Sequence, residues 1–301
     1  MSAGTYVEAV VAGVLRGVTE LFPVSGPGHG VLVPPWLGLP DAGALPAVHL
    51  AIAVALVVFF RRDWARIVRG LRTSARLRRV VTAEQRLAWL LAVLGLPVAL
   101  ASALLSAVLR GTPGTSLAAA IFLVLNGIAL LAAERSARLP RDPVPVAPVP
   151  EPTEVTHDFS AEITMPMRIV RAEEAADRRL ARLGTGEAVL IAAAQLIGLV
   201  PGLSGPGLAT AAGVWRGLPR VDAVRFAFLL ATPAAIGTGL VGAMGTPSLF
   251  ATSALVAALA AGVAGYLALR WLVRHLETRT LTPFAGYCVI AGLGSLAYLL
   301  A

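Results

Sequence analysis

Four side chains capable of chemistry lie close together in the segment RGVTELFPVSGPGH, namely Arg16, Glu20, Ser25 and His29. Arg16 and Glu20 are four residues apart, so a helix would place both on one face. His29 directly follows a Gly-Pro-Gly break, where an imidazole could act as nucleophile, general acid or general base. Two simpler interpretations stay open: Arg16 and Glu20 could neutralise each other, and His29 could be a hydrogen-bonded core residue.

The tetrapeptide SGPG occurs at 25–28 and again at 204–207. Proline and glycine interrupt helices, and a helix that begins after such a break directs its backbone N–H groups and its positive dipole end towards the break. Two breaks that meet inside a membrane would therefore form an anion site. The alternative is that SGPG only provides tight turns for close helix packing.

Composition indicates the environment of these residues. Apolar residues make up 57% of the 301 residues and charged residues 14%, which is typical of integral membrane proteins rather than of a large soluble core. Apolar windows that predict transmembrane helices lie at 44–60, 87–109, 117–133, 226–244, 250–269 and 284–301. The single cysteine, Cys288, excludes an intrachain disulfide and is expected to be a small core side chain.

The 25 basic residues are all arginine, and almost all of them lie in 61–86, 135–182, 216–225 and 270–279. Because these segments are alternate connections between the windows, they are predicted to face the cytoplasm, with both termini outside. No signal peptide is expected, since basic residues and a small-residue cleavage site are missing at the start. The net charge of +8 is explained by the membrane topology and by attraction to anionic lipids. Nucleic-acid binding is not expected, because the basic loops lack the interleaved aromatic residues of nucleic-acid binders.

A proline-rich segment divides the chain into two halves, with six prolines in 139–152. At an offset of 179 residues the two SGPG segments coincide, and 11 of the 33 positions from 8 to 40 are identical. We therefore predict an all-α integral membrane fold built as an inverted repeat. Its parts are a first repeat at 1–134, a cytoplasmic linker at 135–185 and a second repeat at 186–301.

Each repeat is expected to contain a re-entrant helix-loop-helix hairpin followed by three transmembrane helices. The hairpins are predicted at 6–40 and 187–219, because neither apolar piece is long enough to span a membrane with a break in its middle. The first would enter from outside and the second from the cytoplasm. Irregular backbone at membrane depth must be satisfied by protein or by a wet cavity, so the two SGPG tips should meet around such a cavity.

Two longer motifs carry a resemblance to a known family. GVTELFPVSGPGH at 17–29 is similar to the motif G-x-T-E-F-x-P-V-S-S-T-G-H, and PGLSGPG at 201–207 is similar to P-G-x-S-R-S-G. Further similar segments are FAFLLATPAAIG at 226–237, TPFAGY at 282–287 and HLAIAVALVVFFRRDW at 49–64. These motifs belong to the undecaprenyl-diphosphate phosphatase family of bacitracin-resistance membrane proteins. The resemblance implies a cell-membrane hydrolase that converts undecaprenyl diphosphate to undecaprenyl phosphate and phosphate for cell-wall lipid carrier recycling.

The resemblance also implies the site residues. The catalytic set is His29, Glu20 and Ser25, which match the family motif, and the substrate-binding set, which combines matching positions with replaced ones, is Arg16, Gly26, Gly28, Gln195, Ser204, Gly205 and Gly207. The chain departs from the family where Arg16 replaces a glutamate or glutamine, where Gly26 and Pro27 replace a serine and a threonine, and where Gly205 and Pro206 replace an arginine and a serine. Since the arginine replaced by Gly205 would hold the diphosphate, we hypothesise that Arg16 supplies the cation instead.

Cleavage of a phosphoanhydride needs positive charge on the phosphoryl oxygens, an in-line nucleophile and a proton route. The family's carboxylate pair would suit Mg²⁺ or Ca²⁺, but one glutamate remains here, so the metal ligands stay unassigned. The expected partners are a polyprenyl diphosphate and the bilayer, with homo-oligomer formation left open. Because transporters also use inverted repeats with broken helices, the alternative is a catalytically impaired relative that binds or translocates a polyprenyl phosphate or another anionic lipid.

Overall fold

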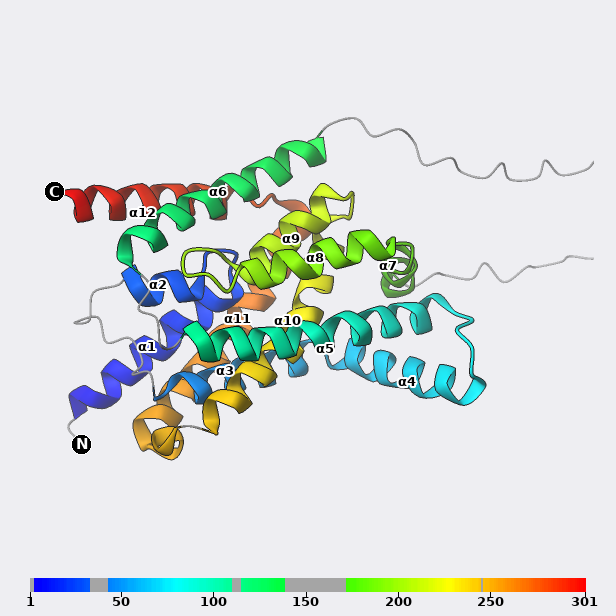
Figure 1. Cartoon of the computed structure of the whole chain (residues 1–301), viewed down its shortest axis with the longest axis horizontal. Helices are drawn as coiled ribbons and strands as arrows, with labels where there is room; N and C mark the ends of the chain where they lie inside the picture. Colours follow the sequence, from blue (N-terminus) through cyan, green and yellow to red (C-terminus); the bar gives the residue numbers. More distant parts are fainter. Residues whose placement is uncertain (1–2, 33–42, 110–114, 139–171, 245) are drawn as a thin grey trace, which may run out of the picture.

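The computed structural model describes residues 3–32, 43–109, 115–138, 172–244 and 246–301, which form helices without any strand (Figure 1). The elements are α1 (Ala3–Leu21), α2 (Gly26–Leu32), α3 (Leu45–Phe59), α4 (Arg61–Leu77), α5 (Ala83–Leu109), α6 (Ser116–Arg138), α7 (Ala172–Ala181), α8 (Thr185–Ile197), α9 (Gly205–Trp215), α10 (Arg220–Ala243), the 3₁₀ turn η2 (Pro247–Phe250), α11 (Thr252–Thr278) and α12 (Thr282–Leu300). The predicted all-α class is confirmed.

All six apolar windows are helical, as α3, α5, α6, α10, α11 and α12. The last five of these are long and apolar enough to cross a membrane. α3 has 15 residues and is followed, after a bend of 79°, by the arginine-rich α4, and this pair can provide a sixth span. The chain is therefore a multi-pass membrane protein.

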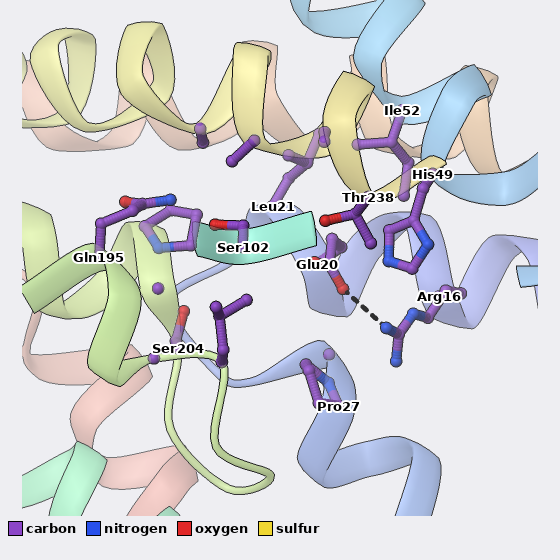
Figure 2. Close-up of a pocket in the computed structure, with 18 of the residues that line it drawn as sticks. Arg16, Glu20, Leu21, Pro27, His49, Ile52, Ser102, Gln195, Ser204 and Thr238 are labelled. Atoms are coloured by element: carbon purple, nitrogen blue, oxygen red, sulfur yellow. Dashed lines mark ion pairs between the residues drawn. The ribbon is translucent and has the colours of Figure 1, made fainter. Parts of the chain in front are cut away.

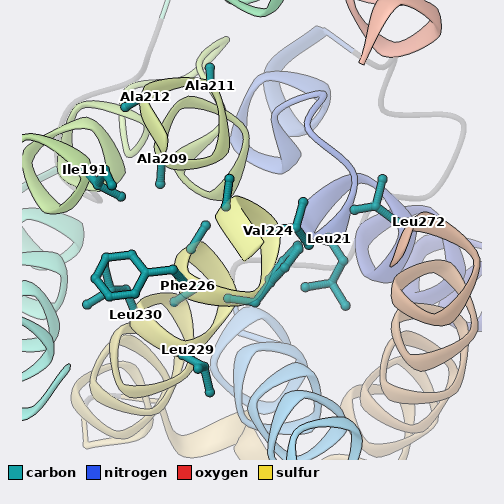
Figure 3. Packing of buried hydrophobic residues seen from close by; sticks show 14 of the residues in the cluster. Leu21, Ile191, Ala209, Ala211, Ala212, Val224, Phe226, Leu229, Leu230 and Leu272 are labelled. Atoms are coloured by element: carbon teal, nitrogen blue, oxygen red, sulfur yellow. The ribbon is translucent and has the colours of Figure 1, made fainter. Parts of the chain in front are cut away.

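The outer surface of these helices is apolar, with Val54, Leu96 and Leu259 exposed on α3, α5 and α11. A soluble protein rarely exposes so much apolar surface, whereas a lipid-facing helix does. In the interior, α10 packs against α3, α5 and α9 and contributes the buried side chains of Phe226 and Leu230 to the core (Figure 3). α10 is thus the central helix around which the hairpins are arranged.

Small residues allow two helix pairs to approach closely, as is common in membranes. On α1, a Cβ added to Gly13 or Gly17 would overlap the carbonyl oxygen of Ala257 or Ala261 on α11. On α6, a Cβ added to Gly127 would lie 2.7 Å from a carbonyl oxygen of α12. α6 and α12 run side by side in Figure 1.

A buried ion pair joins α6, α10 and the start of α12. Glu134 accepts hydrogen bonds from Nε and Nη2 of Arg220 at 2.8 and 2.6 Å, and from the backbone N–H of Leu281 at 2.8 Å. The Glu134 side chain is only 3% exposed. Three helices that are distant in sequence are therefore tied together by one carboxylate.

Both predicted hairpins contain two helices joined by a short break. In the second, α8 and α9 pack against each other and are separated by 198–204. In the first, α1 is followed by the short helix α2, and the final part of the predicted hairpin, including 36–40, lies outside the described residues. α1 has 19 residues and a length of about 28 Å.

The two hairpins approach the middle of the molecule from different ends. In Figure 1, both termini lie at one end, whereas the α4–α5 connection and α7 lie at the other. α1 begins at the end with the termini, and α8 begins beside α7. The packing of α3 against α11 resembles that of α10 against α5, as a repeat requires. The inverted repeat itself, with its boundaries at 134 and 186, stays a prediction.

Parts of the predicted linker at 135–185 are helical. α6 continues to Arg138, and α7 occupies Ala172–Ala181. α7 is held to the rest of the protein by ion pairs, since Asp177 contacts Arg66 on α4 at 3.1 Å and Arg225 on α10 at 2.5 Å. The proline-rich stretch at 139–152 lies outside the described residues.

Candidate functional site

The tips of the two hairpins are in direct contact. Ser25, at the break between α1 and α2, is completely buried and adopts a positive φ of 68°. Its Oγ accepts hydrogen bonds from the N–H of Gly28 on its own hairpin and from the N–H of Gly202 on the other, both at 3.1 Å. The tips of the two hairpins, at 22–28 and 198–207, are called elbows below. The prediction that the two SGPG segments meet is confirmed.

Ser204 caps the second elbow in the same way as Ser25 caps the first. Its Oγ accepts a hydrogen bond from the N–H of Gly207 at 3.2 Å, at the start of α9. The N–H of Ser204 donates to Oδ1 of Asn126 at 3.0 Å, and Nδ2 of Asn126 donates to the carbonyl of Pro23 at 3.0 Å. Asn126 on α6 therefore connects the two elbows a second time. Nothing in the sequence motifs indicated this residue.

Close backbone approach explains two of the glycines. Gly202 has a positive φ of 99°, which side chains rarely adopt. A Cβ added to Gly28 would lie 2.7 Å from the backbone nitrogen of Gly202. The first elbow can therefore touch the second only because Gly28 lacks a side chain, and a Cβ on Gly202 would overlap the Ala119 carbonyl oxygen on α6.

A cavity of about 280 Å³ opens beside the joined elbows and is lined by residues from both halves of the chain (Figure 2). Its polar side chains are Arg16 and Glu20 from α1, His49 from α3, Ser102 from α5, Gln195 from α8, Ser204 from the break before α9, and Thr238 from α10. The remaining wall is mostly apolar and comes from α3, α10 and the two elbows. A concave, largely apolar site with a few convergent polar groups is typical of small-ligand binding.

Arg16 and Glu20 form an ion pair in the wall of this cavity, with Nη2 and Oε2 3.2 Å apart and with side chains 9% and 24% exposed. This is the expected helix-face pairing. Gln195 lies on the other side of the cavity in Figure 2 and corresponds to Arg16 at the repeat offset of 179. Within the described residues, Arg16 Nε and Gln195 Oε1 are buried without a hydrogen-bond partner. Such groups are costly unless a ligand satisfies them.

His29 does not line the cavity. Its Nδ1 lies 2.7 Å from the carbonyl oxygen of Ser25, so Nδ1 is the donor, and Nε2 then accepts a hydrogen bond from the Tyr287 hydroxyl at 2.6 Å. The two rings are also stacked. The hydrogen bonds to Ser25 and to Tyr287 on α12 hold the His29 ring in this position, outside the residues that line the cavity. A catalytic role for His29 stays a prediction.

His49 is the histidine that lines the cavity, on the same side as Arg16 and Glu20 in Figure 2. His49 was not among the residues predicted from the sequence motifs. A signal was present, because His49 is an ionisable residue inside the apolar window 44–60, and such residues in a membrane segment are functional candidates by default.

The predicted substrate-binding residues divide into two groups. Arg16, Gly26, Gln195, Ser204 and Gly205 line the cavity. Gly28 and Gly207 belong instead to the elbow contact, where their N–H groups donate to the two serine hydroxyls. Arg16 is the only arginine in the described lining, so the cavity has no second cation to replace the one missing at Gly205.

The donor set of the cavity does not fit a divalent metal held by protein groups alone. Mg²⁺ and Ca²⁺ bind several oxygen ligands, usually including more than one carboxylate. Among the described residues Glu20 is the one carboxylate in the lining, and it is paired with Arg16. No cluster of three His, Cys, Asp or Glu side chains occurs among the described residues.

Fold and site together define a multi-pass membrane protein with a charged cavity where two broken hairpins meet. The family described as bacitracin resistance protein BacA matches residues 9–294, and the chain belongs to this family. A protein named undecaprenyl-diphosphatase from Mycolicibacterium paratuberculosis is 43% identical over 315 residues, covering 98% of this chain and 97% of the relative. Undecaprenyl-diphosphatase 2 from Frankia alni is 39% identical over 334 residues, covering 96% of both chains. The resemblance expected from the motifs is confirmed.

Proposed function

We propose that the protein is an undecaprenyl-diphosphatase, a membrane hydrolase that converts undecaprenyl diphosphate to undecaprenyl phosphate and phosphate. This activity regenerates the lipid carrier of cell-wall synthesis. Similarity over nearly the full length to relatives of that name supports the proposal. The observation that carries it is the cavity beside the joined elbows, because it combines a cation, a carboxylate and an imidazole with an apolar wall.

The reaction requires a nucleophile in line with the bond from the terminal phosphorus to the bridging oxygen. We assign this role to a water molecule, which adds to the phosphorus as the bond to the bridging oxygen breaks. Undecaprenyl phosphate leaves with the bridging oxygen, and the proton of the water passes to a base. Phosphoryl transfer of this kind depends on positioning and on charge stabilisation more than on covalent chemistry.

Arg16 is the group that stabilises the negative charge of the phosphoryl oxygens. Its guanidinium lies in the cavity wall, and its Nε has no hydrogen-bond partner within the described residues. A phosphoryl group offers the bidentate acceptor that a guanidinium prefers. Arg16 would then compensate for the arginine that Gly205 replaces.

Glu20 and His49 are the proton-transfer candidates of the cavity, because both line it together with Arg16. Glu20 orients the Arg16 guanidinium through their ion pair, and one of the two titratable groups receives the proton of the attacking water. Ser25 is a positioning residue in this proposal, since its hydroxyl already accepts two backbone hydrogen bonds. The mechanism includes no metal step, because the lining offers one carboxylate.

The apolar wall suits the first isoprenyl units of the lipid. Leu45, Ile52 and Leu56 on α3 line the cavity together with Ala231 and Ala234 on α10. In the proposed topology, both termini and the cavity entrance face outwards, and the arginine-rich connections are cytoplasmic. The diphosphate would then enter the cavity from the outer leaflet.

The direct test is phosphate release by the purified protein in detergent, with undecaprenyl diphosphate as substrate and the products separated by chromatography. We expect equal amounts of phosphate and undecaprenyl phosphate, and an isosteric Glu20→Gln variant should be strongly impaired. The hydrolase proposal would be contradicted if the wild-type protein released no phosphate. If it also transported undecaprenyl phosphate across liposome membranes, the alternative function as a lipid carrier would be favoured.

A further inference from the structure

α4 presents a row of arginines that are available for a ligand. Arg69, Arg72 and Arg76 are exposed and stand three and four residues apart, so they lie along one side of the helix. Within the described residues none of the three pairs with a carboxylate, whereas Arg66 on the same helix contacts Asp63 at 2.9 Å. The charges of the row are therefore not neutralised within the described protein.

The arginine row shares one hollow of the surface with Trp64, Val68 and Thr73. Val68 is 41% exposed, although it lies among charged side chains. Tryptophan and arginine together are characteristic of the membrane–water interface, where the indole lies at headgroup level and the guanidinium reaches phosphates. The hollow thus has both an apolar part and a cationic part.

Packing fixes the direction in which this row points. α4 begins after a bend of 79° at the end of α3, and in the predicted topology its arginines lie on the cytoplasmic side of the membrane. The opposite side of α4 packs on α5 through the buried residues Gly70 and Ser74, and the Ser74 hydroxyl accepts a hydrogen bond from Nε1 of Trp89 at 2.8 Å. An amphipathic helix held in this way displays its cationic side to lipid headgroups.

We propose that the hollow on α4 binds the headgroup of an anionic phospholipid. The guanidinium groups of Arg69, Arg72 and Arg76 contact its phosphate, and Trp64 and Val68 contact the glycerol region and the upper acyl chain. Arginine is well suited to this task because its planar fork binds phosphate oxygens in pairs. The hollow shares no residue with the cavity at the elbows, so this site is independent of the proposed hydrolase activity.

The test uses the purified full chain in dodecyl maltoside micelles and counts bound phosphatidylglycerol by native mass spectrometry. The variant carries Arg69→Gln, Arg72→Gln and Arg76→Gln. Each arginine near a phosphate contributes to the binding free energy. The triple change should therefore weaken the binding of the most tightly held phosphatidylglycerol by roughly tenfold to a hundredfold. A single charge reversal, Arg72→Glu, should also weaken phosphatidylglycerol binding. This variant provides an independent test if the triple variant does not fold.

The matched control carries Arg62→Gln, Arg79→Gln and Arg86→Gln, which remove the same charge from exposed positions outside the hollow. We expect this control to bind phosphatidylglycerol within about threefold of wild type, and phosphatidylcholine to bind weakly to all forms. Equal weakening in both triple variants would overturn the proposal in favour of diffuse attraction. Equal binding of phosphatidylcholine, or displacement of the lipid by millimolar inorganic phosphate, would also overturn it.

Discussion

The hydroxyl oxygen of Ser25 lies 3.1 Å from the backbone nitrogen of Gly202, which is 177 residues further along the chain. The same oxygen accepts a hydrogen bond from the N–H of Gly28. One buried hydroxyl therefore holds the tip of the first hairpin against the tip of the second. This contact explains why the chain repeats a serine followed by glycine and proline: the serine caps the helix, and glycines allow the two backbones to touch.

Replacement of Ser25 by glycine distinguishes a positioning role from a nucleophilic one. Glycine keeps the positive φ but removes the hydroxyl, leaving two buried N–H groups without their acceptor. We expect a lower thermal midpoint and a partial loss of phosphate release, since each unsatisfied group costs about 1–3 kcal/mol. A complete loss of activity with an unchanged midpoint would instead identify Ser25 as the nucleophile.

Asn126→Leu should loosen the elbows through the second connection between them. The change removes the partner of the buried Ser204 N–H and leaves the buried Pro23 carbonyl with only the weaker Cys288 thiol as a donor. We expect a loss of roughly 2–5 kcal/mol in unfolding free energy, seen as a lower thermal midpoint in detergent. Ser136→Ala is the control on the same helix, because the Ser136 hydroxyl bonds only to its own helix at Ala133. Equal midpoints for the two variants would contradict the bridging role.

His49 and His29 should differ in their effects on catalysis. We expect His49→Gln to lower kcat by roughly a hundredfold or more and to change the pH profile of the rate, as loss of a general acid or base does. His29→Gln should act more weakly, and Tyr287→Phe should reproduce its effect, because the two rings share one hydrogen bond. A severe loss with His29→Gln and normal kinetics with His49→Gln would return the catalytic role to His29.

The buried and exposed ion pairs should differ in their contributions to stability. Arg220→Ala leaves the buried Glu134 carboxylate without its main partner and should cost about 3–5 kcal/mol. Arg216→Ala removes the partner of Glu187, whose side chain is 29% exposed, and should cost less than about 1 kcal/mol. Thermal unfolding of the two variants in the same detergent measures the difference, and equal shifts would contradict it.

The exposed pair should also respond to acid. A hydrogen bond from the Gly184 N–H and the Arg216 guanidinium hold the pKa of Glu187 below its usual value. The small stabilisation from Glu187 is therefore present at neutral pH and is lost as the pH falls through this lowered pKa.

Patterns that are local in sequence predicted much of this protein. The six apolar windows became helices because a run of apolar residues has one stable form in a membrane. The repeated SGPG segments indicated two elbows that meet, since broken backbone at membrane depth needs protein partners. The spacing of Arg16 and Glu20 predicted their ion pair.

Features that depend on distant side chains could not be predicted in this way. The direction of the His29 ring is decided by Tyr287, which follows 258 residues later. Asn126 joins the elbows from a helix whose sequence carries no motif. His49 enters the cavity because α3 packs between α10 and α11, and that arrangement is not visible in one sequence.

Arg16 is the cation proposed to hold the terminal phosphate, and Gln195, which aligns with Arg16 at an offset of 179 residues, provides the test. Steady-state phosphate release from undecaprenyl diphosphate should be measured for Arg16→Gln and for the double variant Arg16→Gln, Gln195→Arg, which returns a guanidinium to the opposite wall. We predict a fall in kcat/KM of roughly a hundredfold or more for the single variant, and partial recovery in the double variant. Unchanged kcat/KM in Arg16→Gln would show that Arg16 does not hold the terminal phosphate.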